Sequence, residues 1–99
     1  MIKIEKLTVK RIASIALPIL KNNDVTKAGV FGSAALGNMK KKSDVDFLIK
    51  FKPGKSLLDL VRLKYQLEAK LKKKVDLVTY NSVHPLLKEK IMKEEIRIL

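Results

Sequence analysis

The sequence predicts a small α/β or α+β domain with a mixed sheet of about three strands and about four flanking helices. Helical and strand-like apolar patterns alternate along all 99 residues. Apolar residues make up 46% of the chain and charged residues 32%, which is a globular balance. Because no linker, repeat or low-complexity segment interrupts the pattern, residues 1–99 are expected to form a single domain with a small core.

Composition narrows the class of protein further. Cysteine is absent and His84 is the single histidine, which excludes disulfides, thiolate metal sites and His-rich zinc sites. No apolar run approaches the length of a membrane span and no signal-peptide pattern is visible, so a cytoplasmic protein is expected. The formal net charge of +12 favours nucleotides, nucleic acid or an acidic partner, although a solvated lysine surface explains it equally well.

The chain is expected to begin with a helix. Thr8 can cap it, and apolar residues then recur at helical spacing until residues 22–24. Pro18 lies inside this pattern, and a proline in a helix interior removes a hydrogen bond. A kink or a broken turn is therefore expected near residues 14–17.

A first strand is predicted over residues 25–31, followed by a turn at Gly32. Residues 33–36 are expected to begin a short helix that Gly37 closes, and residues 38–42 form a polar loop.

The clearest strand pattern covers residues 43–51. Side chains alternate between the two faces of a strand, so one face is expected to be apolar. That face carries Val45, Phe47, Ile49 and Phe51. The other face carries Asp44, Asp46, Leu48 and Lys50.

A turn over residues 52–55 leads to a long helix, which Ser56 and Asp59 open as a capping box and residues 72–74 end. Its expected buried stripe is Leu60, Leu63, Leu67 and Leu71. A third strand is predicted over residues 75–79, with Asp76 on the face opposite Val75. Pro85 suits the first turn of a last helix, which His84 starts. The residues expected on its inner side are Leu87, Ile91 and Ile98.

Two carboxylates carry the functional prediction. Asp44 and Asp46 share one strand face, roughly 6.5–7 Å apart along it. Gly32 and Ser33 precede Asp44 with ten residues between them, and their turn offers backbone amides to a phosphate. Carboxylate oxygens suit Mg²⁺, and two ions about 3.5–4 Å apart are typical of nucleotidyl transfer. The pattern therefore predicts a site for a metal-bound triphosphate.

Asp76 and a lysine run extend this prediction. If the third strand pairs beside the second, Asp76 projects from the face of Asp46, and three carboxylates converge on two metals. A solvent-facing aspartate on an edge strand is the alternative. Lys40, Lys41 and Lys42 could contact the triphosphate or a partner, although such a run is more often a solvated loop.

The order Gly32-Ser33, ten residues, then Asp44-Val45-Asp46 resembles the signature of the minimal nucleotidyltransferases, a branch of the DNA polymerase β-like nucleotidyltransferase superfamily. The similarity extends over nearly the whole chain. It implies the polymerase β-like fold, with Asp76 as the third catalytic carboxylate. Many members carry an arginine where this chain has Leu36, so either a nearby lysine substitutes or activity is reduced.

The resemblance implies Mg²⁺-dependent transfer of a nucleoside monophosphate, AMP from ATP, to a hydroxyl. Asp44, Asp46 and Asp76 would be catalytic and bind two Mg²⁺ ions, while Gly32, Ser33 and Lys42 would bind the nucleotide. It further implies the antitoxin of a type VII-like toxin–antitoxin pair, whose HEPN ribonuclease partner is adenylylated on tyrosine.

Two alternatives remain open. The chain could be a catalytically weak binding module that neutralises a partner by docking, an alternative that Leu36 keeps open. It could also be a nucleic-acid-binding protein that uses its charge. Against the second, only five aromatic residues are present, and Phe31, Phe47 and Phe51 are expected to be buried rather than to stack on bases.

Overall fold

The computed structural model describes residues 8–37 and 43–99. This part of the chain contains three α-helices and four strands. The α+β class is therefore confirmed, whereas the expected numbers, about three strands and about four helices, are wrong. The elements follow in the order α1 (Val9–Asn22), β1 (Val25–Phe31), β2 (Val45–Phe51), α2 (Leu57–Leu71), β3 (Val75–Thr79), the 3-10 helix η1 (Tyr80–Ser82), α3 (Pro85–Glu94) and β4 (Ile96–Arg97).

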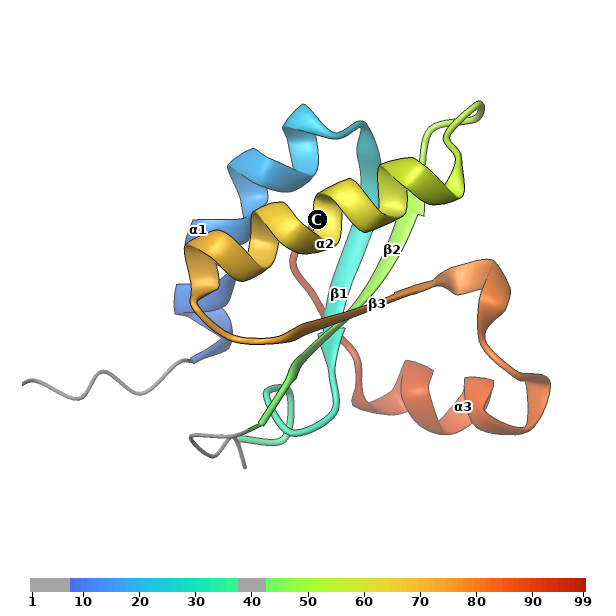
Figure 1. Ribbon diagram of the computed structural model, residues 1–99. Coiled ribbons are helices and arrows are strands. Elements are labelled where there is room, and N and C mark those ends of the chain that lie inside the picture. The colour runs from blue at the N-terminus through green and yellow to red at the C-terminus, as the bar shows by residue number, and fades with distance from the viewer. Residues whose placement is uncertain (1–7, 38–42) are drawn as a thin grey trace, which may run out of the picture.

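The four strands form one mixed sheet in the order β3-β2-β1-β4. β1 is antiparallel to β2 and β4, whereas β2 and β3 are parallel. Helices α1 and α2 lie side by side over one face of the sheet, and α3 lies on its other side (Figure 1). The end of β1 and the starts of β2 and β3 therefore meet at one end of the sheet.

The core lies between the α1–α2 layer and the sheet, as the apolar periodicities predict. α2 buries Leu63, Leu67 and Leu71, with Leu60 packed against them. The other buried members of this core are Ile12, Ala16, Leu20, Val25, Ala28, Val30, Ala34, Val45, Phe47, Ile49 and Val75. Leu48 is also fully buried but lies outside this cluster, on the face of β2 that it shares with Asp46.

Two local predictions in the first half are corrected. α1 begins after the Thr8 cap as expected but runs through Pro18 without a broken turn, because packing of its buried stripe holds the helix together. The short helix expected over residues 33–36 is absent, and residues 32–37 form turns. Gly32 and Gly37 both have left-handed φ values, 70° and 72°, which confine the segment to a single helix-like turn.

The C-terminal part also differs from expectation. α3 ends at Glu94, and β4 then pairs with Gly29 and Val30 of β1. Ile98 packs on the core from beyond this strand, with its amide donating to Ala28 O at 3.0 Å, so it does not belong to the helix. Leu87 is 54% exposed rather than buried, because α3 contributes no fully buried side chain.

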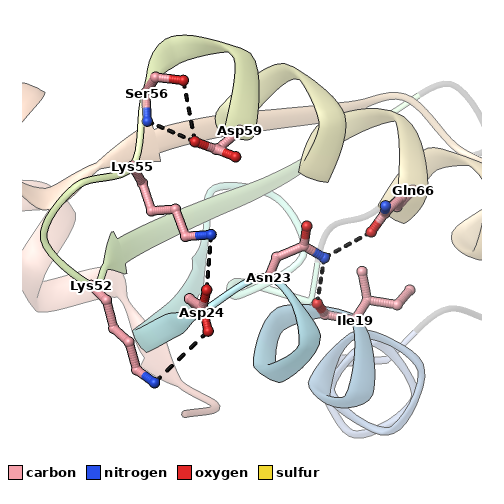
Figure 2. A network of polar contacts seen from close by, with 8 residues as sticks. All are labelled: Ile19, Asn23, Asp24, Lys52, Lys55, Ser56, Asp59 and Gln66. Carbon is pink, nitrogen blue, oxygen red and sulfur yellow. Dashed lines mark hydrogen bonds and ion pairs between the residues drawn. The ribbon is translucent and has the colours of Figure 1, made fainter.

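A polar network secures the turns at the opposite end of the sheet (Figure 2). Asp24 accepts Lys55 Nζ at 2.8 Å and lies 3.8 Å from Lys52 Nζ, which ties the α1–β1 turn to the β2–α2 turn. The pKa of Asp24 is lowered mainly by its hydrogen bond from Lys55. Ser56 N donates to Asp59 Oδ2 at 2.8 Å, which confirms the predicted capping box of α2.

Candidate active site

Three acidic residues meet at the end of the sheet where β2 and β3 begin. Asp46 stands directly opposite Asp76 in the parallel β2–β3 pair, so the predicted pairing of the third strand beside the second is confirmed. Asp44 lies two residues before Asp46 and is exposed, just outside β2. On its other side Asp46 pairs with Phe31, the last residue of β1. The structure thus gathers the three predicted carboxylates at the strand end that Gly32 follows.

The packing of β2 explains why these carboxylates face away from the helices. Val45, Phe47 and Ile49 are fully buried in the core beneath α1 and α2. Strand alternation then directs Asp46 to the opposite face. The buried apolar residues therefore fix the orientation of the acid.

The environment of Asp46 disfavours its charge. Partial burial, followed by the negative charges of Asp76 and Asp44, raises the pKa of Asp46 to about 6. Carboxylates that repel one another in this way are stabilised by a bound cation.

The turn at Gly32 is in direct contact with Asp46. Glycine is required at residue 32 for two reasons. A Cβ atom there would overlap Asp46 Oδ2, and the φ of Gly32 is +70°. The amides of Leu36 and Gly37 donate to Gly32 O and Ala34 O. The amide of Ser33 has no such acceptor within the described residues, which leaves it available to an anion.

The described carboxylates do not by themselves form a complete metal-binding site. Among residues 8–37 and 43–99, no three acidic or histidine side chains lie close enough together to hold a metal ion unaided. The donors still fit Mg²⁺, which usually takes one or two carboxylates and completes its coordination with substrate phosphates. Asp46 packed against the Gly32 backbone suits an ion that arrives with a polyphosphate.

Three hydrogen bonds fix the start of β3 beside β2. Val75 N donates to Glu68 Oε2 at 2.9 Å, and Val45 N donates to Lys74 O at 2.9 Å. Lys73 Nζ donates to Ser43 O at 3.3 Å. These contacts set the register that places Asp76 opposite Asp46.

A pocket of about 600 Å³ borders two of the acids at the β3 edge. It is lined by Asp44, Lys64, Glu68, Lys72, Lys73, Lys74, Val75 and Asp76. Sequence reasoning missed this pocket. The lysine run at residues 72–74 indicates only cations at a helix end, and the i, i+4 pair Lys64 and Glu68 on α2 is the one signal of the pocket in the sequence.

The remaining residues singled out in the sequence are the lysine run at residues 40–42 and His84. Lys40, Lys41 and Lys42 lie outside the described residues. His84 Nδ1 accepts the amide of Leu86 at 3.1 Å, so His84 starts α3 as predicted. No helix in the described ranges is long and apolar enough to cross a bilayer.

Comparison with protein families matches residues 15–99 to the model described as "Polymerase beta, Nucleotidyltransferase". A protein of Methanocaldococcus jannaschii, provisionally named a protein adenylyltransferase, is 50% identical over 94% of this chain and 100% of its own length. The protein adenylyltransferase MntA of Thermococcus cleftensis is 34% identical over 93% of this chain and 97% of its own length.

Solved structures share the fold. A chain described as a minimal nucleotidyltransferase superposes with a TM-score of 0.78 at 34% identity, covering 89% of this chain and 90% of its own. The MNT antitoxin from a complex with a tri-AMPylated HEPN toxin of Shewanella oneidensis gives 0.71 at 17% identity, covering 91% and 71% of the two chains. At that identity the second match speaks for the fold alone.

Proposed function

This chain belongs to the polymerase β nucleotidyltransferase family, and from that premise we propose that it is a Mg²⁺-dependent protein adenylyltransferase. It transfers AMP from ATP to a hydroxyl of a partner protein. The partner is a HEPN-type toxin, the acceptor is a tyrosine, and the chain acts in the cytoplasm as the antitoxin of the pair. The relatives named as protein adenylyltransferases support a protein as acceptor, and the structure of an MNT antitoxin with an AMPylated HEPN toxin supports a HEPN-type partner.

The observation that carries the proposal is the position of Asp46. It stands opposite Asp76 in the sheet and packs against Gly32. Asp46 contacts the turn that is proposed to bind phosphate and faces a second carboxylate. In this position it can act on both the triphosphate and the attacking hydroxyl. Asp44, Asp46 and Asp76 would hold two Mg²⁺ ions, which neutralise phosphate charge and activate the attacking hydroxyl.

The protein's own groups have separable tasks in this mechanism. Gly32 and Ser33 hold the triphosphate through backbone amides and the Ser33 hydroxyl. Asp46 must be ionised to act as a ligand, and its pKa of about 6 keeps it largely ionised at neutral pH. Asp76 orients the acceptor side. The acceptor oxygen bonds to the α-phosphorus, the bond to pyrophosphate breaks, and the hydroxyl proton passes to solvent.

The test is co-incubation of the chain with a HEPN-type protein, using ATP with either Mg²⁺ or EDTA. Intact mass of the HEPN-type protein should show added AMP only with Mg²⁺. The Asp44→Asn variant should leave it unmodified. Full modification in EDTA, or by Asp44→Asn, would contradict the proposal.

A docking module is the second candidate, and one observation favours it. α2 exposes a run of apolar side chains, with Leu57 and Leu58 each 74% exposed and Tyr65 64% exposed, which suits a protein interface. Leu36, at the position of the family's common arginine, is exposed as well. If Asp44→Asn still forms the complex and still protects cells, docking alone explains neutralisation. Retention of free RNA by the wild type would instead favour a nucleic-acid-binding role for the +12 charge.

A further inference from the structure

A second pocket lies at the end of the sheet opposite the acids. It has a volume of about 370 Å³ and is lined by residues 49–55 and 79–81, where the parallel strands β2 and β3 end. In open α/β sheets, ligands commonly bind outside the carboxyl ends of the strands. Neither Asp46 nor Asp76 nor Gly32 lines this pocket, so a ligand bound in it would not occupy the carboxylate site.

The lining of this carboxyl-end pocket is cationic. Lys50, Lys52 and Lys55 contribute to it, whereas no acidic residue of the described chain does. The side chain of Lys50 makes no hydrogen bond or ion pair with another residue in the described ranges. The nearby start of α2 adds little charge, because Asp59 already caps it. Three lysines around a concave surface favour an anionic ligand.

Asp24 is the internal counterion of two of these lysines. Lys55 Nζ donates to Asp24 Oδ2 at 2.8 Å, and Lys52 Nζ lies 3.8 Å from Asp24 Oδ1 (Figure 2). Asp24 itself does not line the pocket, and it has a left-handed φ of 60°. Exposed ion pairs of this kind contribute little to stability. A phosphate that enters the pocket can therefore displace Asp24 from its lysines at low cost.

The remaining lining combines flat apolar surfaces with a polar side chain. Phe51, Pro53 and Tyr80 supply the apolar surfaces, and the carboxamide of Asn81 can both donate and accept hydrogen bonds. The Tyr80 hydroxyl is already engaged, because it donates to Glu95, so Tyr80 offers its ring to the pocket rather than its polar group. A nucleoside base has matching features, an apolar ring with a polar edge.

We propose that the carboxyl-end pocket is a second ligand site, which binds a nucleoside phosphate separately from the transfer reaction. The lysines hold the phosphate, and the walls formed by Phe51, Pro53 and Tyr80 take the base. A volume of about 370 Å³ lies within the usual range of small-molecule sites and suits a single nucleotide. Binding is reversible and breaks no covalent bond. As the phosphate enters, Asp24 releases Lys55.

The experiment follows the amide chemical shifts of the 99-residue chain by NMR. EDTA is present throughout, so that no metal-bound nucleotide loads the carboxylates. AMP, GMP, CMP and UMP are titrated separately, and inorganic phosphate and the matching nucleosides serve as partial ligands. Saturable shifts should appear at residues 50–55 and 79–81 rather than at residues 32–36. At least one nucleotide should bind about tenfold more tightly than inorganic phosphate or its own nucleoside.

A pair of lysine variants tests the phosphate contacts. The double variant Lys50→Gln, Lys52→Gln should weaken nucleotide binding by about tenfold or more. The matched control is Lys88→Gln, Lys90→Gln on α3, which changes the net charge equally and should leave the affinity within about twofold of wild type. Melting curves confirm that both variants fold.

A carboxylate variant makes the opposite prediction. Asp24→Asn should strengthen nucleotide binding by about threefold, because it frees Lys55, and asparagine tolerates a left-handed φ. The backbone bond from Lys52 N to Asp24 O is kept in this variant. Its control is Glu89→Gln, which frees Lys93 on α3 instead and should leave the affinity unchanged.

Each outcome supports or overturns the site. Shifts confined to residues 50–55 and 79–81, with opposite effects of the lysine and Asp24 variants, support it. The absence of a saturable shift at these residues with all four nucleotides overturns it. Inorganic phosphate or a nucleoside that binds as tightly as the nucleotide overturns the assignment of a nucleoside phosphate. Equal weakening by both lysine pairs reduces the effect to net charge and overturns the site as well.

A final arm distinguishes the two sources of this chemistry, a free nucleotide and one nucleotide of a single-stranded RNA. A hexanucleotide RNA is titrated against the same amides. Tighter binding of the RNA than of any mononucleotide, weakened by Lys50→Gln, Lys52→Gln, supports the site with RNA as its source. Tighter binding of a mononucleotide supports the site with a free nucleotide as its occupant.

Discussion

The carboxylate of Glu95 lies against the backbone of Gly29, so closely that a Cβ atom at residue 29 would overlap it. Glu95 follows α3, Gly29 lies in β1, and the Tyr80 hydroxyl donates to the same carboxylate oxygen. Lys27 Nζ lies 4.3 Å from the centroid of the Tyr80 ring. This cluster ties the end of α3 to the sheet.

Gly29→Ala should therefore destabilise the fold by about 1–2 kcal/mol, because Glu95 must move and lose its bond from Tyr80. Urea unfolding gives the free energy. The control is the double variant with Glu95→Ala, in which the added methyl has nothing to displace. A cost of Gly29→Ala that is undiminished in the Glu95→Ala background would show that the cluster is not the cause.

Asp46→Asn should raise stability in EDTA, with a defined pH dependence. The folded pKa of about 6 lies above the ordinary aspartate value of 3.8, so folding favours the protonated carboxyl. Wild-type stability relative to the variant is therefore greatest below pH 3.8, falls as the pH rises to 6, and stays low above that. Because Asp46 is only partly buried, the gain at pH 8 should be about 1–2 kcal/mol, less than the pKa shift alone implies.

Thermal melts at pH 4 and pH 8 check this prediction, and added Mg²⁺ should shrink the gain by stabilising the wild type. The same variant should have no detectable AMP transfer. Identical melting temperatures at both pH values would remove the electrostatic argument.

Asp76→Asn should affect turnover more than nucleotide binding. Asp76 lines the pocket at the β3 edge, whereas the Gly32 turn, which is proposed to hold the triphosphate, contacts Asp46. Mg-ATP affinity should stay within about tenfold, or roughly 1.4 kcal/mol, and the single-turnover rate should fall by a factor of about a hundred or more. Calorimetry and rapid-quench kinetics measure the two effects, and unchanged turnover would make Asp76 an ordinary exposed strand residue.

Gly32→Ala and Gly37→Ala form a matched pair. Both residues have a left-handed φ, 70° and 72°, so each alanine should cost about 1 kcal/mol of stability. A Cβ at Gly37 meets no atom within 4 Å, whereas one at Gly32 overlaps Asp46 Oδ2. Only Gly32→Ala should therefore abolish transfer. Equal activity in the two variants would mean that the contact with Asp46 is not required.

The sequence predicts those parts of the fold whose signals are local. Three such signals depend only on residues close together in the sequence: the alternation along β2, the capping box of Ser56 and the leucine stripe of α2. All three are confirmed. β4 has only two residues, too few for any periodicity, and exists because it pairs with β1. The lysines of the pocket at the β3 edge come from the middle and end of α2 and the turn before β3, so they meet only through tertiary packing.

The amide of Val75 bound to Glu68, and that of Val45 bound to Lys74, align two parallel strands to the single residue. A slip of one position would turn Asp76 toward the core and leave an apolar side chain beside Asp46. Such a molecule would be wholly inert, not slow. A variant that weakens these two hydrogen bonds should therefore contain fewer active molecules, while each active molecule keeps the wild-type turnover rate. Only a count of active sites would distinguish such a variant from a poor catalyst.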